Sequence, residues 1–142
     1  MEMKIPSILL AAALSSASAR GALPDVLFSV GKDDQSCAEF ALAQGAGWQK
    51  YKDTFKEPVV FTVGQSKPET AWPYIHPNTH DKWAGGRTHP FTVRFTLPEA
   101  PTSSLTLVIG QVNALSGPTC ILTVNGKEVK RTDVPDGSGD SS

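Results

Sequence analysis

The sequence lacks the features that mark a membrane or nucleic-acid-binding protein. Its clearest apolar run, Ile8–Leu14, is far shorter than the ~20 residues that a helix needs to cross a bilayer. Acidic and basic residues nearly balance, at 14 and 13, so there is no basic excess of the kind that nucleic-acid binding needs. We therefore expect neither a membrane nor a nucleic acid as a partner.

Catalytic and metal-binding motifs are missing as well. The chain has no Gly-rich phosphate loop, no nucleophile elbow and no CxxC pair. His76 and His80 are four residues apart, a spacing that places both on one face only in a helix, and Pro73 and Gly85-Gly86 leave little room for one. We expect no bound metal and no cofactor, although the residues are compatible with a structural calcium ion.

Proline and glycine, in contrast, are plentiful. The chain has 11 prolines and 12 glycines in 142 residues, and no long stretch with helical periodicity. This composition is typical of a single all-β domain with many turns. The turn residues separate apolar stretches at intervals that favour an antiparallel β-sandwich.

The N-terminus has the layout of a secretory signal peptide at residues 1–19. Lys4 supplies the positive charge, Ile8–Leu14 the apolar segment and Ala17-Ser18-Ala19 the small-residue cleavage motif. Cleavage before Arg20 would release a secreted protein, either extracellular or periplasmic. The predicted divisions are a signal peptide at 1–19, a β-sandwich at 20–132 and a flexible polar tail at 133–142.

Alternation of apolar and polar residues is strictest at Phe91–Leu97, which predicts a strand with one face in a core. Cys120–Val129 reads as a hairpin around Asn125-Gly126, the dipeptide preferred in type I′ turns. Trp48–Glu57 fits either a helical turn or a strand edge with a bulge. Further strands are predicted at Val26–Val30, Ala38–Ala43, Pro58–Gly64 and Leu105–Val112.

The two cysteines, Cys37 and Cys120, leave two interpretations open. An oxidising compartment permits a disulfide, which would close a ring of about eighty residues and stabilise the fold by roughly 4 kcal/mol. Both cysteines also lie in strand-like patterns, where separate buried thiols are common. The sequence does not decide between them.

The stretch Trp72–Phe95 holds two of the three tryptophans and all three histidines. Sugars present C–H faces flanked by hydroxyls, so surfaces that bind them combine exposed rings with hydrogen-bonding side chains. Trp72, which precedes Pro73, is expected to plug the end of the sandwich instead. The residues predicted to contact a carbohydrate are Tyr74, Asp81, Trp83, Arg87 and His89. Of these, Arg87 would pair with a uronate carboxylate.

An enzymatic alternative uses the same loop. β-Elimination from a uronide needs a base at C5 and a cation that stabilises the developing enolate. His80, Lys82 and Arg87 could take those roles. The same three residues are also what a solvated loop contains, so this alternative is the weaker one.

The residues of this stretch also carry a family resemblance. WPYIHP, DKWAGGRTHPFTVRFTLPEAP and TVNG, with the upstream LFSVGKDDQSCAEFALA and VVFTVG, resemble the third domain of family 4 polysaccharide lyases. These enzymes are the rhamnogalacturonan lyases, and that domain is described as carbohydrate-binding-module-like. The resemblance extends from about Val26 to Ser142.

The resemblance implies a galactose-binding-like jelly roll that binds pectic polysaccharide without cleaving it. It implies a catalytic domain as partner, on the full-length protein or on another chain, because the catalytic residues of those lyases lie in a separate domain. The alternatives are a rhamnogalacturonan lyase and a structural module without sugar affinity. Family members continue into two further strands, whereas this chain stops at Gly137–Ser142, so we expect a sandwich that lacks its last strands or is completed by another chain.

Overall fold

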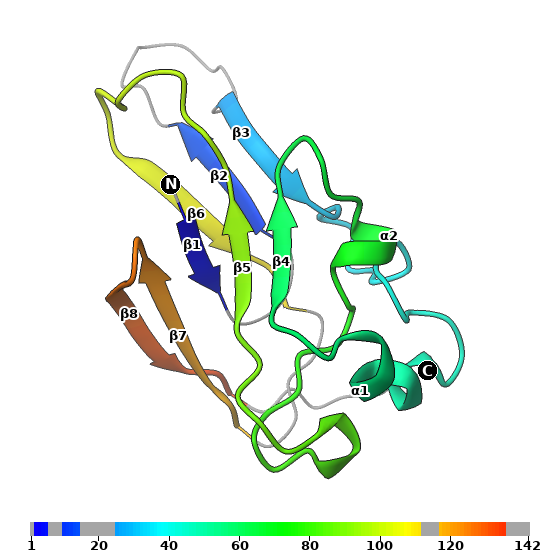
Figure 1. Cartoon of the computed structure of the whole chain (residues 1–142). Coiled ribbons are helices and arrows are strands. Elements are labelled where there is room, and N and C mark those ends of the chain that lie inside the picture. Colours follow the sequence, from blue (N-terminus) through cyan, green and yellow to red (C-terminus); the bar gives the residue numbers. More distant parts are fainter. Residues whose placement is uncertain (1, 6–9, 15–24, 112–116, 136–142) are drawn as a thin grey trace.

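The computed structural model describes residues 2–5, 10–14, 25–111 and 117–135. They form a five-stranded sheet, in the order β4-β5-β1-β7-β8, and a three-stranded sheet, in the order β3-β2-β6. The smaller sheet lies behind the larger one in Figure 1. The strands are β1 (Glu2–Ile5), β2 (Leu10–Leu14), β3 (Asp25–Val30), β4 (Val59–Thr62), β5 (Phe91–Arg94), β6 (Leu105–Ile109), β7 (Thr119–Val124) and β8 (Lys127–Asp133).

Short helical turns lie beside β4 and at one end of the sheets (Figure 1). They are the 3₁₀ turns η1 (Gly47–Lys50) and η2 (Lys82–Ala84) and the helices α1 (Tyr51–Thr54) and α2 (Pro68–Ala71). The all-β class is therefore confirmed. Among the described residues, no helix is long and apolar enough to cross a membrane.

Most predicted strands are present, although several are shorter than predicted. The hairpin is confirmed: Asn125 and Gly126 both have positive φ, at 51° and 80°, and join β7 to β8. Val59 and Phe61 of β4 are buried, as their alternation predicts. β5 ends at Arg94, whereas the alternation continues to Leu97.

Two local predictions are corrected or settled. The predicted strand Ala38–Ala43 is wrong, because the chain turns there: Phe40 N–H donates to the Cys37 carbonyl at 3.0 Å, and Leu42 has a φ of 65°. Trp48–Thr54 is helical, in η1 and α1, whereas Phe55–Glu57 is not. Its rings recur every three or four residues because they lie on one side of these turns.

The pairing of β4 with β5 departs from an antiparallel sandwich. These two strands run parallel, with Val59 opposite Phe91 and Phe61 opposite Val93. The other strand pairs are antiparallel. A parallel pair needs a crossover connection, and here the chain from β4 to β5 carries α2 and η2. This connection is the stretch that holds the candidate site.

The N-terminal segment contains two of the strands. β1 and β2 both lie within residues 1–19, for which the sequence predicts a signal peptide, and each is in the interior of a sheet. The signal peptide itself stays a prediction. β8 continues to Asp133, and most of the predicted tail, residues 136–142, lies outside the described residues.

A cluster of aromatic and β-branched side chains forms the core. Trp72, Phe91 and Val93 are at most 1% exposed. The Trp72 ring meets Phe91 edge to face at a centroid distance of 4.9 Å, and Phe61 at 6.1 Å. Trp72 is thus a core residue, which confirms the expectation that it fills the sandwich.

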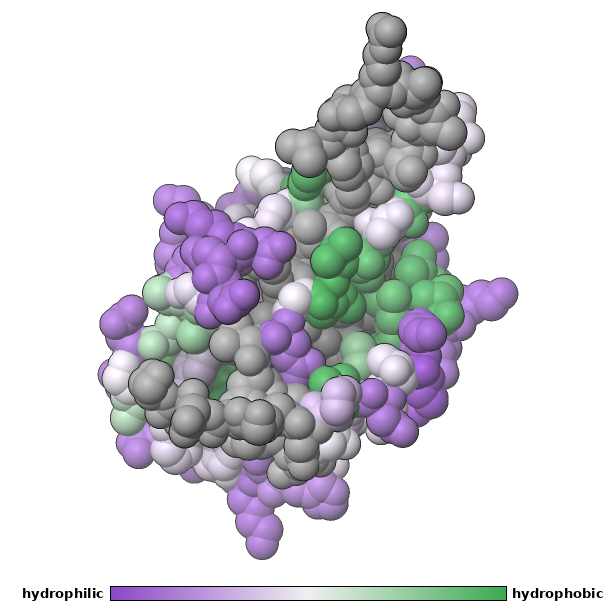
Figure 2. Space-filling model, turned by 180° about the vertical axis from the view of Figure 1, so that it is seen from behind, coloured by the Kyte–Doolittle hydropathy of each residue, from purple (hydrophilic) through white to green (hydrophobic). Residues whose placement is uncertain are grey.

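Burial is unequal along the chain. Every fully buried side chain in the described residues lies at or before Phe95. Leu107, Ile109, Leu122 and Val124 of β6 and β7 contact the core but stay half-buried. Figure 2 shows hydrophobic residues gathered on the back of the molecule, and Val108 of β6 is 50% exposed.

Candidate functional site

The loop that carries Trp83 is organised by one carboxylate. Asp81 accepts the Asn78 backbone N–H at 2.8 Å with one oxygen and the Trp83 indole N–H at 3.0 Å with the other. The Asp81 carbonyl accepts the Gly86 N–H at 3.0 Å. Gly85 and Gly86 both have positive φ, which glycine adopts without strain, so the chain can turn back here. Asp81 therefore fixes the orientation of the Trp83 ring.

Four rings line up from the surface to the core at this loop. Trp48 meets Trp83 edge to face at 5.3 Å, and Trp83 meets Tyr51 in the same way at 6.0 Å. Tyr51 then contacts His89 at 5.3 Å. Trp48 is 36% exposed, Trp83 is half-buried, and Tyr51 and His89 are buried. We call the outer part of this row, Trp48 and Trp83, the Trp48–Trp83 face.

The backbone at Gly47 brings Trp48 to this position. A Cβ atom there would lie 2.1 Å from the Leu42 carbonyl oxygen, a distance that only glycine permits. The backbone at the start of η1 thus packs closely against Leu42. The next residue, Trp48, lies beside Trp83, in a loop that is far away in sequence. Sequence reasoning did not select Trp48, since only its exposure and its contact with Trp83 distinguish it from a core ring.

Arg87 holds two parts of the site together. Its guanidinium donates to the backbone carbonyls of Phe55 and Lys56, just after α1. Carbonyls at the end of a helix lack intrahelical partners, so a cation whose N–H groups donate to them caps the helix. Arg87 was predicted to meet a uronate carboxylate. The structure uses two of its N–H groups within the protein.

His76 and His89 lie behind the face. Burial and, to a lesser extent, the neighbouring His89 lower the pKa of His76 to about 4, against backbone hydrogen bonds that raise it. Burial also lowers the pKa of His89, with Arg87 acting in the same direction and Asp81 opposing it. Both imidazoles are thus neutral at neutral pH. Their Nε2 atoms have no hydrogen-bond partner among the described residues.

A small cavity of about 20 Å³ lies between Tyr51, Arg87 and His89. It has room for about one water molecule, whose hydrogen bond could reach a buried nitrogen. A sugar ring does not fit there. A larger hollow, of about 350 Å³, lies along Thr54–Val60 and Ala71.

Tyr74 and the two cysteines lie away from the ring row. Tyr74 is half-buried against the core, and burial and nearby Cys37 both raise the pKa of its hydroxyl. Cys37 is in the turn after β3 and Cys120 is on β7, so they belong to different parts of the fold. No disulfide joins them in the structure. The disulfide alternative is therefore not the one that the structure adopts.

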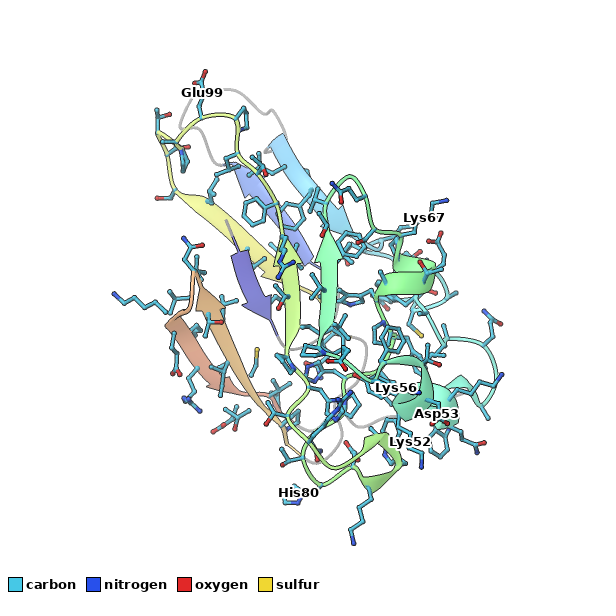
Figure 3. The ribbon with its side chains drawn as sticks, viewed as in Figure 1. Lys52, Asp53, Lys56, Lys67, His80 and Glu99 are labelled. Atoms are coloured by element: carbon cyan, nitrogen blue, oxygen red, sulfur yellow. The ribbon has the colours of Figure 1, made fainter. Side chains whose placement is uncertain are left out.

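Lysines lie on two elements that carry or border the Trp48–Trp83 face. Lys52 is on α1 and Lys82 is on η2, two elements in contact with each other. Figure 3 shows Lys52, Asp53 and Lys56 around α1, with His80 at the same end of the molecule and Glu99 at the opposite end. The described part of the chain contains no ion pair for Lys52 or Lys82. Their charges are available to an anionic ligand.

No group of three or more metal-ligating side chains occurs among the residues that the structure describes. His76 and His80 are not on a common helix, since only η2 forms between Pro73 and Gly85-Gly86. The candidate site consists of rings, the Asp81 carboxylate, the Arg87 guanidinium and lysine ammonium groups.

A comparison with known families agrees with the all-β fold. A family model described as CBM-like, polysaccharide lyase family 4, domain III, matches residues 26–142. The chain belongs to this family. The match covers β3 to β8, so the CBM-like domain includes the core, the Trp48–Trp83 face and the loop behind it. No curated protein and no solved structure matches the chain.

Proposed function

We propose that the CBM-like domain binds pectic polysaccharide of the rhamnogalacturonan type, without cleaving it. One observation carries the proposal: Trp48 exposes part of its ring while Trp83, Tyr51 and His89 hold it from behind. A ring held rigidly loses little entropy when a ligand covers it. The apolar face of a pyranose provides such a cover.

Lys52 and Lys82 give the face its preference for acidic sugars. The protein as a whole carries a net charge of −1, so attraction for a uronate must come from local cations. Both ammonium groups are on elements that border the face, and a charge-assisted hydrogen bond to a carboxylate is stronger than a neutral one. Asp81 and Arg87 act by positioning: the first orients Trp83, and the second joins the loop to α1.

Affinity gel electrophoresis with rhamnogalacturonan in the gel tests the proposal. We expect the polymer to retard the protein, and Trp48→Ala to reduce the affinity by at least about tenfold, because central aromatic contacts dominate such interfaces. Val129→Ala is the matched control, since it also shortens an exposed apolar side chain but on β8. Equal retardation of Trp48→Ala and the wild type would contradict the assignment of the face.

The charge assignment has its own pair of variants. Lys82→Gln and Lys130→Gln each remove one positive charge, so their mobilities without polymer change equally. We expect only Lys82→Gln to weaken retardation by rhamnogalacturonan, and added salt to reduce the difference. Equal weakening in both variants would mean that net charge alone causes retardation.

The lyase alternative is separated by a different readout. Incubation with rhamnogalacturonan, followed by absorbance of unsaturated products, detects β-elimination. We expect no increase, because Arg87, the cation of that alternative, is engaged with backbone carbonyls. If unsaturated products form with the wild type and not with Lys82→Gln, the function of this loop is catalysis rather than binding.

A further inference from the structure

Two strands near the N-terminus occupy the interior of the sheets. β1 lies between β5 and β7, and β2 lies between β3 and β6 (Figure 1). Met3 of β1 is opposite Val93 on one side and Val124 on the other. Each of these strands therefore connects two strands that do not pair with each other.

β2 makes the more extensive connection. All five residues from Leu10 to Leu14 pair with β6, with Leu10 opposite Ile109 and Leu14 opposite Leu105. The same five residues pair with β3, with one irregularity between Ala12 and Ala13. A strand flanked on both sides directs its N–H and C=O groups alternately to its two neighbours. In the part of the chain that the structure describes, β2 is the strand that joins β3 to β6.

Without these strands the sheets would separate into pieces. In the described part of the chain, β3 and β6 pair with no strand other than β2. β5 would keep only β4, and β7 would keep only β8. Rows of backbone N–H and C=O groups would then lose their partners on four strands, and each such group that stays buried costs about 1–3 kcal/mol.

The same strands attach the C-terminal strands to the core. Among the described residues, β6 and the β7–β8 hairpin have no backbone pairing with β3, β4 or β5 except through β1 and β2. Their side chains contribute only half-buried contacts to the core. Backbone pairing with the N-terminal segment is thus the main connection between the two parts of the molecule.

We propose that the gap between β5 and β7 and the gap between β3 and β6 form one strand-acceptor site, whose occupant is the N-terminal segment through its strands β1 and β2. Recognition is by antiparallel backbone pairing on both sides, the mode by which extended peptides add to sheets. The occupant stays bound when the covalent link through residues 15–24 is cut. This site is separate from the Trp48–Trp83 face.

The predicted cleavage before Arg20 falls within that link. A cut made after folding leaves the segment in its site. A cut made before folding, as signal peptidases make it, leaves both gaps open to another extended segment. The chain that begins at Arg20 therefore needs an extended segment in the acceptor site in order to fold.

The full chain with a specific protease site in place of residues 17–22 tests the proposal. The protein is folded, cut and passed through a size-exclusion column, and the peak is analysed by mass spectrometry. We expect the N-terminal fragment to elute with the rest of the chain and to be replaced slowly by an excess of labelled synthetic peptide 1–19. Release of the fragment from a chain that stays folded and monomeric would overturn the proposal. Release followed by aggregation would overturn it too, because pairing would then require the covalent link.

A pair of substitutions keeps the test specific to backbone pairing. Ala12→Pro removes the N–H at the middle of β2 and is expected to release the fragment after cutting. Ala12→Ser keeps that N–H and is expected to retain the fragment. Equal retention of both variants would contradict recognition through the backbone. The chain that begins at Arg20 is expected to fold cooperatively only when peptide 1–19 is added, and cooperative folding without it would refute the acceptor site.

Discussion

The region from β3 to β5 and the region from β6 to β8 both consist of short strands, yet they bury their side chains differently. The first contains every fully buried side chain that the structure describes, with Trp72, Phe91 and Val93 at its centre. The second contributes half-buried residues such as Leu107 and Leu122. The first region packs against itself, whereas the second is held mainly by pairing with β1 and β2.

Side-chain burial in the first region therefore stabilises the fold, whereas backbone pairing attaches the second region to it. Removal of a side chain from the first region creates a cavity that its rigid surroundings cannot fill. In the second region the same change removes less buried surface, because solvent already reaches the side chain that is removed. The candidate ligand face, with its supporting rings, belongs entirely to the first region.

The largest effect is expected for Phe91→Ala. The Phe91 ring is 1% exposed and contacts Trp72 at 4.9 Å and His76 at 4.2 Å. Its removal should lower the free energy of unfolding by about 3–5 kcal/mol. Urea denaturation followed by circular dichroism measures this loss. A loss under about 1 kcal/mol would mean that the first region is not the stabilising core.

Acid is expected to act on the first region through its histidines, since all three lie there. The His76 pKa is about 4 in the folded protein and 6.5 in its usual environment. The unfolded chain therefore binds the proton first, and stability that is complete above pH 6.5 is lost as the pH falls toward 4. The loss reaches about 3 kcal/mol for this residue, and His89 adds to it in the same direction.

Thermal unfolding between pH 7 and pH 4.5 measures that loss. The control is His76→Gln, in which the part of the pH dependence due to His76 should disappear even if the variant is less stable at pH 7. An identical pH dependence in the variant and the wild type would show that His76 is already solvated in the folded protein.

A smaller effect is expected in the second region. Leu122→Ala on β7 removes a side chain that only partly contacts the core, and should lower the free energy of unfolding by about 1–2 kcal/mol. Val129→Thr on β8 is the control, with a change within about 0.5 kcal/mol, because Val129 is 53% exposed. If Leu122→Ala costs as much as Phe91→Ala, the two regions share one core and the comparison fails.

Local patterns in the sequence predicted the parts of the fold that depend on near neighbours. Alternation located β4 and β5, and Asn125-Gly126 located the turn between β7 and β8, because side-chain period and turn geometry are local properties. The parallel direction of β4 and β5 was missed, since alternation is the same in either direction. The Ala38–Ala43 prediction failed because tertiary hydrogen bonds control this stretch, including Ala41 N–H to the Trp72 carbonyl at 2.9 Å.

The candidate site also combines contacts between near neighbours in sequence with contacts that only folding creates. Trp83 and Asp81 are two residues apart, and their hydrogen bond is one that a loop can form by itself. Trp48 and the carbonyl partners of Arg87 are distant in sequence, so only folding brings them to the loop. Residue content therefore identified the loop, whereas the exposed ring and the role of Arg87 required the structure.

The three tryptophans provide the most direct test of the ligand face. Each indole N–H gives its own signal in a ¹H–¹⁵N correlation spectrum, and Trp72, buried in the core, serves as the internal control. On titration with rhamnogalacturonan oligosaccharides, we predict that the signals of Trp48 and Trp83 shift together while that of Trp72 stays in place. No shift of Trp48 at saturating oligosaccharide, or a shift of Trp72 alone, would contradict binding at the Trp48–Trp83 face.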